Sequence, residues 1–410
     1  MSFEIARMAI SSVSQSLDVI SNNIANAHSY GYKAKRANFS AMYAGNMPNG
    51  AEVSSITESI TSTGGVRNTG GAMDAMITDR GFFAVRDKSG QVLFTRVGMF
   101  NVDKDGYVVD ANGHKVQGYA AFRDASGQLV PGAALGPLGD LRIETGQIGA
   151  VASTKLAYNG NMSADWDIKP AVPAFDKDMP TTFNSSVTSY AYDSQGTKHT
   201  VTQYFVKSAN YTVNLYYSVD GGATAAAPDT TLVFDGQGQL QSVDGTAGNT
   251  THTLNFTPTG GGAPVALQID YVGTTKYAGD SSTLTNTPNG NASGMLNGTS
   301  IAEDGSIIAT YTNGASQVVG TVAVATFANP SGLKPGANTS WTSSVDSGTP
   351  LYSTPGSATA SALAVGVLED SNVDLTGELV NLMSAQRNYQ ANTKVISAES
   401  EMMQSLMQAI

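Results

Sequence analysis

Cysteine is absent from this chain of 410 residues. Its absence excludes disulfide bonds, thiolate metal sites and cysteine nucleophiles together, although it does not fix the compartment in which the protein works. Charged residues are also scarce, at 13%, and the net charge of −11 lacks the basic surplus by which proteins bind nucleic acid. We therefore expect no nucleic acid binding. No run of about 18 apolar residues occurs, so we expect no membrane insertion either.

Motifs for catalysis or cofactor binding are missing as well. The four histidines (His28, His114, His199 and His252) are isolated and have no metal-ligand spacing. The sequence contains no Walker-type phosphate loop and no GxSxG nucleophile elbow. The acidic segment 103–106 is flanked by strand-like residues, which favours a hairpin turn over a calcium loop. We therefore predict no enzymatic activity and no catalytic, cofactor or metal site.

Glycine, serine, threonine and asparagine are plentiful, and short apolar stretches alternate with turn signals from residue 81 onward. This pattern predicts many short β-strands. Strand-like stretches in 82–119 and 306–327 are far apart in sequence and could pair as two halves of one domain. A further series over 187–243 reads as a meander. A chain of this length exceeds one ordinary core, so several domains are expected.

The two ends of the chain have helical periodicity instead. Near the N-terminus, over about 2–27, apolar residues alternate spacings of three and four; the set assigned to self-assembly is Ile10, Val13, Leu17, Ile20 and Ile24. Near the C-terminus the corresponding set is Leu375, Leu379, Leu382, Tyr389, Ile396, Met403 and Ile410, of which all but Leu379 stand seven apart. Such seams predict helices that pair as a coiled-coil-like rod, although an ordinary intramolecular core gives the same stripe.

Together these segments predict a multidomain fold, mainly β with α-helical termini, in which the β-rich domains are nested. We expect a terminal helical domain from residues 1–32 plus 368–410, a connector from 33–70 plus 352–367, a β-rich middle domain from 71–145 plus 291–351, and an inserted β-rich outer domain from 146–290. The connector is expected to be extended with short ordered pieces, and its hinge candidates are Gly45, Pro48, Gly50, Gly70 and Gly71.

Two longer motifs carry a family resemblance. Segment 17–33 contains LDVISNNIANA and YGYK, and segment 371–390 contains SNVDL, ELV and AQRNYQ. Both resemble the terminal signatures of the bacterial flagellar rod, hook and hook-associated axial proteins. The motif residues carried over are Asn22, Asn23, Asn26, Gly31, Asn372, Asp374, Gln386, Arg387 and Asn388. Segments 81–107 and 317–333 are similar to the β-rich domain of the hook members, and 192–205 to an inserted domain that shorter rod members lack.

The resemblance implies a structural subunit that self-assembles into a flexible curved tube, a universal joint that transmits torque from the motor rod to the filament. Its implied partners are other copies of itself, rod and hook–filament junction proteins at the tube ends, and the hook cap and type III export apparatus during assembly. The terminal helices would form the inner tube. The implied location is extracellular, in the basal body and hook of the flagellum.

Export is expected to proceed without a cleaved signal peptide, because Glu4 and Arg7 interrupt the N-terminal segment. Two alternatives to the hook subunit stay open. One is a distal-rod or hook–filament junction protein of the same family, which would share both terminal motifs. The other is an extracellular β-rich hydrolase, which a convergent pocket of histidine and carboxylates would support.

Overall fold

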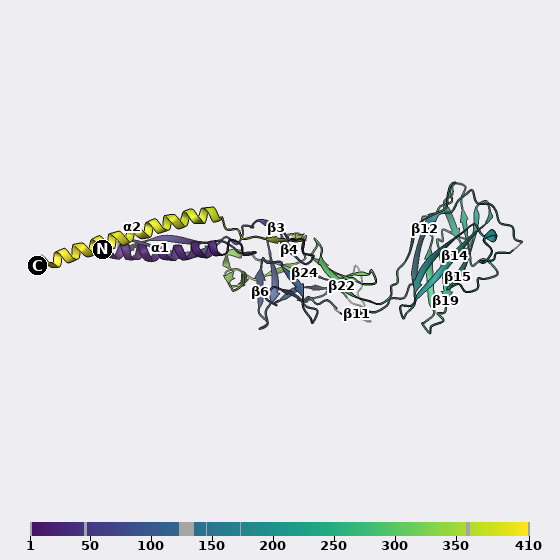
Figure 1. Ribbon diagram of the computed structural model, residues 1–410, viewed down its shortest axis with the longest axis horizontal. Coiled ribbons are helices and arrows are strands. Elements are labelled where there is room, and N and C mark those ends of the chain that lie inside the picture. The colour runs from purple at the N-terminus through teal and green to yellow at the C-terminus, as the bar shows by residue number, and fades with distance from the viewer. Residues whose placement is uncertain are drawn as a thin grey trace. The chain divides into compact units, whose positions relative to one another are not determined.

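The computed structural model describes residues 2–44, 47–122, 135–144, 146–172, 174–357 and 361–408. Long helices lie at the two ends of the chain, α1 (Ser2–Ala25) and α2 (Leu375–Gln408), with β-strands between them (Figure 1). Contacts divide the chain into a first unit (Met1–Thr145, Asn297–Thr310 and Ser316–Ile410) and a second unit (Gly146–Leu296 and Tyr311–Ala315). The predicted fold class, mainly β with helical termini, is confirmed; the four expected domain boundaries stay a prediction.

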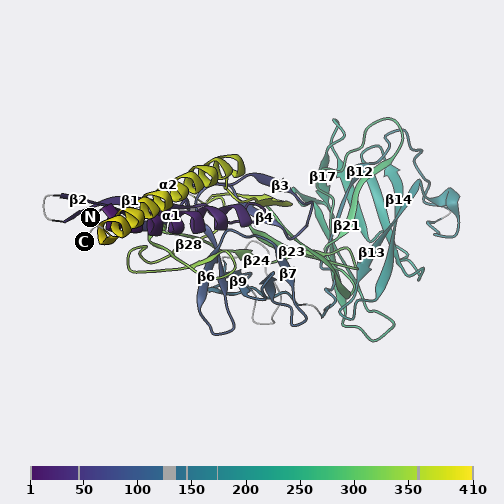
Figure 2. The same ribbon diagram turned by 60° about the vertical axis from the view of Figure 1, so that its left-hand side comes forward.

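Helices α1 and α2 lie side by side in the first unit and run antiparallel, since both chain ends are at the same end of the pair (Figures 1 and 2). A long hairpin of β1 (Lys35–Ala44) and β2 (Met47–Glu58) also packs on α1. The Ser12 hydroxyl of α1, for example, donates to the carbonyl of Ala51 at 2.7 Å. The expectation of only short ordered pieces in 33–70 was therefore wrong, because packing on a helix orders strands whose own sequence is largely polar.

The main sheet of the first unit joins two distant parts of the sequence, as predicted. Its strands follow the order β23-β24-β9-β5-β6-β27-β26. The early strands are β3 (Val66–Asn68), β4 (Ala75–Ile77), β5 (Phe82–Arg86), β6 (Val92–Thr95), β7 (Phe100–Val102), β8 (Val108–Asp110), β9 (Lys115–Ala120) and β10 (Leu138–Asp140). The late ones are β23 (Ser306–Tyr311), β24 (Ser316–Val322), β25 (Val324–Thr326), β26 (Lys334–Pro335), β27 (Ser340–Thr342), β28 (Leu351–Ser353), β29 (Leu363–Val365) and β30 (Val367–Glu369).

Early and late strands pair directly: β9 with β24, β5 with β25 and β6 with β27. An aromatic cluster covers one face of this sheet. The ring of Phe82 packs edge-on against Phe327 and Trp341, and Phe94 packs against Phe327 at 4.8 Å between ring centroids. These rings come from both halves of the unit, so neither half buries its apolar face without the other.

The tight turns between strands use one recurring device. Asp103 accepts hydrogen bonds through Oδ1 from the N–H groups two and four residues on, and Gly106 follows with φ of +83°. The same arrangement occurs at Asp87, Asp110, Asp193 and Asp235. The aspartate replaces backbone partners that a tight turn lacks, and glycine tolerates the left-handed conformation. The prediction that segment 103–106 is a hairpin turn is confirmed.

Two sheets form the second unit. A meander contains β13 (Ser185–Tyr192), β14 (Lys198–Ala209), β15 (Thr212–Val219), β16 (Thr230–Phe234), β17 (Leu240–Val243) and β18 (Thr246–Ala247) in sequential order. The other sheet contains β12 (Lys155–Asn161), β19 (Thr251–Phe256), β20 (Val265–Asp270) and β21 (Ser282–Pro288). Strand β11 (Gln147–Ile148) pairs with the start of β22 (Gly294–Ile301). The meander confirms the interpretation of 187–243.

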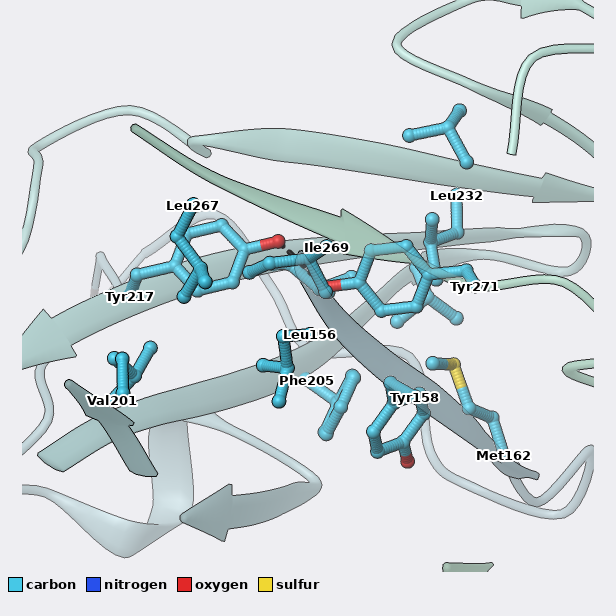
Figure 3. Packing of buried hydrophobic residues seen from close by; sticks show 14 of the residues in the cluster. Leu156, Tyr158, Met162, Val201, Phe205, Tyr217, Leu232, Leu267, Ile269 and Tyr271 are labelled. Atoms are coloured by element: carbon cyan, nitrogen blue, oxygen red, sulfur yellow. Dashed lines mark hydrogen bonds between the residues drawn. The ribbon is translucent and has the colours of Figure 1, made fainter. Parts of the chain in front are cut away.

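The core of the second unit lies between these sheets and contains a buried polar chain. The hydroxyls of Tyr217 and Tyr271 are 2.6 Å apart (Figure 3), and the Tyr271 hydroxyl donates to Gln203 Oε1 at 2.7 Å. Apolar side chains such as Leu267 and Phe205 surround the two rings. Because each hydroxyl has a partner, the core gains the large apolar area of two tyrosines and leaves neither tyrosine hydroxyl unpaired.

His199 in the second unit gives a testable pH dependence. Its Nδ1 lies 2.7 Å from Asp220 and its Nε2 lies 3.4 Å from Asp193. Burial opposes protonation, but the hydrogen bonds and charges of Asp220 and Asp193 outweigh it and raise the pKa of His199. Such a group stabilises the fold fully below its unfolded pKa of about 6.5, and this stability is lost as pH rises through the higher folded pKa.

We therefore expect the second unit to melt at a lower temperature at pH 8 than at pH 6. Trp166 fluorescence in a Trp341→Phe background reports this unit, because the two tryptophans lie in different units. His199→Gln should flatten the dependence, whereas His28→Gln in the first unit should leave it unchanged. A wild-type midpoint that rises above pH 6 would contradict the assignment.

Candidate self-assembly site

The two terminal motifs meet in one place, which we call the terminal junction: residues 23, 31–35, 369–372 and 378. It lies where the chain leaves α1, enters β1 and later passes from β30 into α2. Its N-terminal and C-terminal members are more than 300 residues apart in sequence, yet they are joined by hydrogen bonds and a buried ion pair. The junction therefore fixes how the two helices are attached to the β-structure of the first unit.

Asn23 is the centre of one half of the junction. Its side chain is fully buried; its amide nitrogen donates to the Lys35 carbonyl at 2.7 Å and to Glu378 Oε1 at 2.9 Å. Its Oδ1 accepts from the Lys35 N–H at 2.9 Å and from the Tyr32 hydroxyl at 3.2 Å. Aspartate and leucine have a similar size, but only the asparagine amide supplies both N–H donors and an acceptor at this position. Asn23 thus holds the end of α1, the start of β1 and the first turn of α2 together.

Asn372 has the matching role on the C-terminal side. Its Oδ1 accepts from the Ala34 N–H at 2.7 Å, and its amide nitrogen donates to the carbonyls of Ser59 and Ser62 at 3.0 and 3.1 Å. The Asn372 N–H also donates to the Tyr32 carbonyl at 3.3 Å. These bonds satisfy backbone N–H and carbonyl groups of residues 32, 34, 59 and 62, none of which lies in a strand.

A buried cluster of charges completes the junction. Lys33 Nζ lies 2.6 Å from Glu369 Oε1, with both side chains no more than 1% exposed, and Arg96 Nη1 lies 3.5 Å from Glu369 Oε2. Lys33 also donates to the Ser62 carbonyl at 2.6 Å, and Glu369 accepts the Gly64 N–H at 3.0 Å. Burial lowers the pKa of Lys33, and the charge of Glu369 opposes this. One carboxylate thus serves two buried cations.

Glycine is required at two points of close approach. Gly31 has φ of +65° and donates its N–H to the Glu369 carbonyl at 2.8 Å. A Cβ on Gly64 would lie 1.8 Å from the Asp370 carbonyl oxygen. Gly31 lies beyond the end of the first helix, because α1 ends at Ala25 and a turn follows. The left-handed residue instead directs the chain into the junction.

The remaining motif residues act locally or are exposed. Asn22 and Asn26 donate side-chain hydrogen bonds to carbonyls four residues earlier, and the Asp374 carboxylate accepts the Thr376 N–H at the start of α2. Gln386, Arg387 and Asn388 are exposed on α2. The motif therefore contains three kinds of residue: those that build the junction, those that bond to nearby backbone groups, and those that present a polar surface.

Helix α2 exposes much of its apolar surface. Leu382 and Ile396 of the predicted set are half-buried, whereas Leu375, Leu379, Tyr389 and Met403 are 40–66% exposed. Their exposed apolar neighbours on the helix are Val380, Met383, Val395, Met402 and Met407. Ile410 lies outside the described residues. In α1 the predicted set is more enclosed, with Ile20 buried and Ile10, Val13, Leu17 and Ile24 half-buried.

The hinge candidates fall into two groups. Pro48 and Gly50 lie inside β2, and Gly45 lies outside the described residues. A strand paired in a hairpin is a poor hinge, so the structure corrects the prediction for Pro48 and Gly50. Gly70 has φ of +67°, and its N–H donates to the Gly366 carbonyl at 3.0 Å. Gly71 follows it in the segment between β3 and β4.

Among the described residues, no group of three or more metal-ligating side chains could hold an ion. The nearest approach to a catalytic arrangement is His199 between Asp193 and Asp220. Both of its ring nitrogens are engaged by carboxylates, so neither is free to take a proton from a substrate. This observation does not support the hydrolase alternative.

Comparisons with known proteins agree with this geometry. Family models match for the flagellar hook protein FlgE/F/G D1 domain over residues 76–164, the flagellar basal body protein FlaE D2 domain over 160–291, and the C-terminal part of the flagellar basal body rod FlgEFG proteins over 364–409. The flagellar hook protein FlgE of Salmonella typhimurium is 33% identical over 412 residues, covering 99% of both chains. The chain belongs to the flagellar hook protein family.

Other members show the same relation. The hook protein FlgE of Escherichia coli K12 is 32% identical and also covers 99% of both chains. The crystal structure of Helicobacter pylori hook protein FlgE2 shares the fold with a TM-score of 0.51 and 14% identity, covering 70% of this chain and 96% of that one. As a member of this family the protein is a structural subunit of the flagellar hook and not an enzyme. None of the helices in the described residues combines the length and apolarity needed to cross a bilayer.

Proposed function

We propose that this hook subunit polymerises into a curved tube through its terminal helices, and that the tube transmits torque from motor rod to filament. The observation that carries this proposal is the apolar surface of α2, where Leu375, Leu379, Tyr389 and Met403 are exposed in a single chain. Exposed apolar patches of this kind mark interaction sites. Ile10, Val13, Leu17, Ile20 and Ile24 of α1, with Leu382 and Ile396 of α2, complete the proposed self-assembly set, to which the sequence adds Ile410.

The terminal junction supports this function because it makes each helix pair a rigid extension of the β-structure. A torque applied to the helices would reach the β-structure through Asn23, Asn372 and the buried pair of Lys33 with Glu369. Bending needs compliance elsewhere, and we place it at Gly70, Gly71 and Gly366. Gly366 has φ of +70°, and its Cβ position would lie 3.8 Å from the Gly70 Cα, so two glycines cross without side chains.

The proposed partners are further copies of this chain, rod and hook–filament junction proteins at the tube ends, and the hook cap and type III export apparatus during assembly. The proposed location is outside the cell, reached without cleavage of a signal peptide. A distal-rod or junction protein is the second candidate within the family. The match over 99% of the length of the hook relatives, including residues 160–291, favours the hook subunit.

Electron microscopy of the purified chain under polymerising conditions tests the proposal. We expect curved tubes at high protein concentration or on seeding with short tube fragments, because weak interfaces need mass action or a template. Straight tubes would favour the rod alternative, and persistent monomers under every seeded condition would contradict self-assembly.

A further inference from the structure

The second unit contains two buried lysines without an acidic partner. Lys207 lies near the end of β14 and Lys276 follows β20, and each is only 7% exposed. Among the described residues one other lysine, Lys33, is buried, and it is paired with Glu369 at 2.6 Å. Lysine is almost never buried in proteins unless its charge is paired. Lys207 and Lys276 therefore depart from this general rule, which Lys33 follows.

Backbone carbonyls hold the two ammonium groups in place. Lys207 Nζ donates to the carbonyls of Ala164 and Trp166 at 2.7 and 2.6 Å, and Lys276 Nζ donates to the Asn210 carbonyl at 2.7 Å. An ammonium has three donors, so one remains on Lys207 and two remain on Lys276. In the described part of the chain neither lysine forms an ion pair, and the carbonyls that hold the two ammonium groups carry no net charge.

Both lysines line one pocket of about 270 Å³, together with Asn210, Tyr211 and the turn between β16 and β17. A water molecule occupies about 30 Å³ of the liquid, so the pocket has room for a carboxylate or phosphate group. The two charges are close enough to interact: burial lowers the pKa of Lys276, and the charge of Lys207 lowers it further. An anion between them would relieve this repulsion.

The pocket wall is fixed before any ligand arrives. The Lys276 N–H donates to the Gly238 carbonyl at 2.8 Å, and a Cβ on Gly238 would lie 2.6 Å from the Lys276 carbonyl oxygen. Asp235, the acidic residue of the lining, already accepts the N–H groups of Gln237 and Gln239 through Oδ1 at 2.9 and 2.8 Å. These hydrogen bonds stabilise the turn, and no ion pair joins Asp235 to either lysine within the described residues.

We propose that this pocket binds an oxyanion, a carboxylate or phosphate group, between the ammonium groups of Lys207 and Lys276. Charge-assisted hydrogen bonds from a preformed, partly enclosed site are among the stronger polar contacts in proteins. The same chemistry has two sources. One is a free anion from solution, and the other is a surface carboxylate of a second copy of this chain, which has 33 acidic and 22 basic residues.

The free-anion source is tested on the soluble full-length chain with inorganic phosphate, at ionic strength kept constant with sodium chloride. Calorimetric titration should show one saturable site. Lys276→Met, which keeps an unbranched apolar stem and removes the charge, should weaken phosphate binding about tenfold or more. Lys198→Met, which alters an exposed lysine of the same unit, should leave the affinity unchanged. Equal phosphate affinity in wild type and Lys276→Met would overturn the proposal.

A second measurement does not depend on whether the variant folds. In the wild-type chain the ammonium resonances of Lys207 and Lys276 should shift together and saturably in nuclear magnetic resonance spectra as phosphate is added. The second-copy source is tested in assembled tubes with a carbodiimide, which joins an amine to a carboxylate in contact with it. Mass spectrometry should then find Lys207 or Lys276 joined to an acidic residue of another copy. Absence of both phosphate binding and such a cross-link would overturn the proposal.

Discussion

Replacing Glu369 by alanine is expected to lower the free energy of unfolding of the first unit by about 3–5 kcal/mol. The carboxylate contacts Lys33 at 2.6 Å and Arg96 at 3.5 Å, and all three side chains are at most 3% exposed. Removing it leaves Lys33 without its ion-pair partner and Arg96 with only the charge of Asp79 to oppose its own. Glu369→Gln should be nearly as damaging, because it keeps the shape and one hydrogen-bond acceptor but not the charge.

Urea unfolding followed by Trp341 fluorescence in a Trp166→Phe background measures this effect in the first unit. Glu4→Gln is the matched control, since Glu4 forms an exposed ion pair with Arg7 at 3.0 Å. Exposed pairs contribute about 0–1 kcal/mol, so the control should unfold almost as the wild type does. If Glu369→Gln is as mild as Glu4→Gln, the buried charges are not what secures the terminal junction.

Strand positions in the β-rich parts could be predicted to within a few residues. Period-two alternation and Asp-x-x-Gly turns are local signals, and β5 and β23 have the boundaries that these signals indicate. The hairpin of β1 and β2 could not be predicted in the same way. Its strands contain polar residues such as Arg36, Asn38 and Glu52, and its order depends on α1, which only the folded chain supplies.

The candidate site was predictable in its residues but not in its contacts. The resemblance of the terminal motifs marked Asn23, Gly31 and Asn372, and all three lie in the terminal junction. Lys33 and Glu369 carry the buried charge of the same junction, yet they are separated by 336 residues and nothing in their local sequence links them. Pairing of this kind is a property of the tertiary fold, so neither the periodicity nor the composition of the sequence predicts it.

Helical periodicity likewise predicted which residues form the apolar stripe of α2. It did not predict how that stripe is divided between contacts within the chain and contacts with other subunits. A seven-residue repeat identifies Leu382, Tyr389 and Ile396 as one face of the helix. It does not say whether one partner or several cover that face. In the single chain the stripe is divided, because Leu382 and Ile396 are half-buried and Tyr389 is 41% exposed. The exposed part is the surface that we propose other subunits cover.

The second large effect is expected from Ile396→Asp, which should abolish tube formation while the β-rich units melt as in the wild type. Ile396 is half-buried on the stripe between Tyr389 and Met403, both of which are exposed. A new carboxylate here would be enclosed without a partner once subunits associate, at a cost of several kcal/mol. Because each 1.4 kcal/mol is tenfold in an equilibrium constant, the concentration needed for assembly should rise about 100-fold or more.

Ser397→Asp provides the control for this prediction, because it places the same residue one position along α2 on an exposed side chain. Any loss of intrinsic helix stability from aspartate is then common to both variants, and only the position relative to the stripe differs. Sedimentation and electron microscopy should show tubes from Ser397→Asp and soluble monomers from Ile396→Asp. In a polymer every subunit carries the enclosed carboxylate, so each contact between subunits is weakened. Tubes of normal yield from Ile396→Asp would therefore place the subunit interface elsewhere.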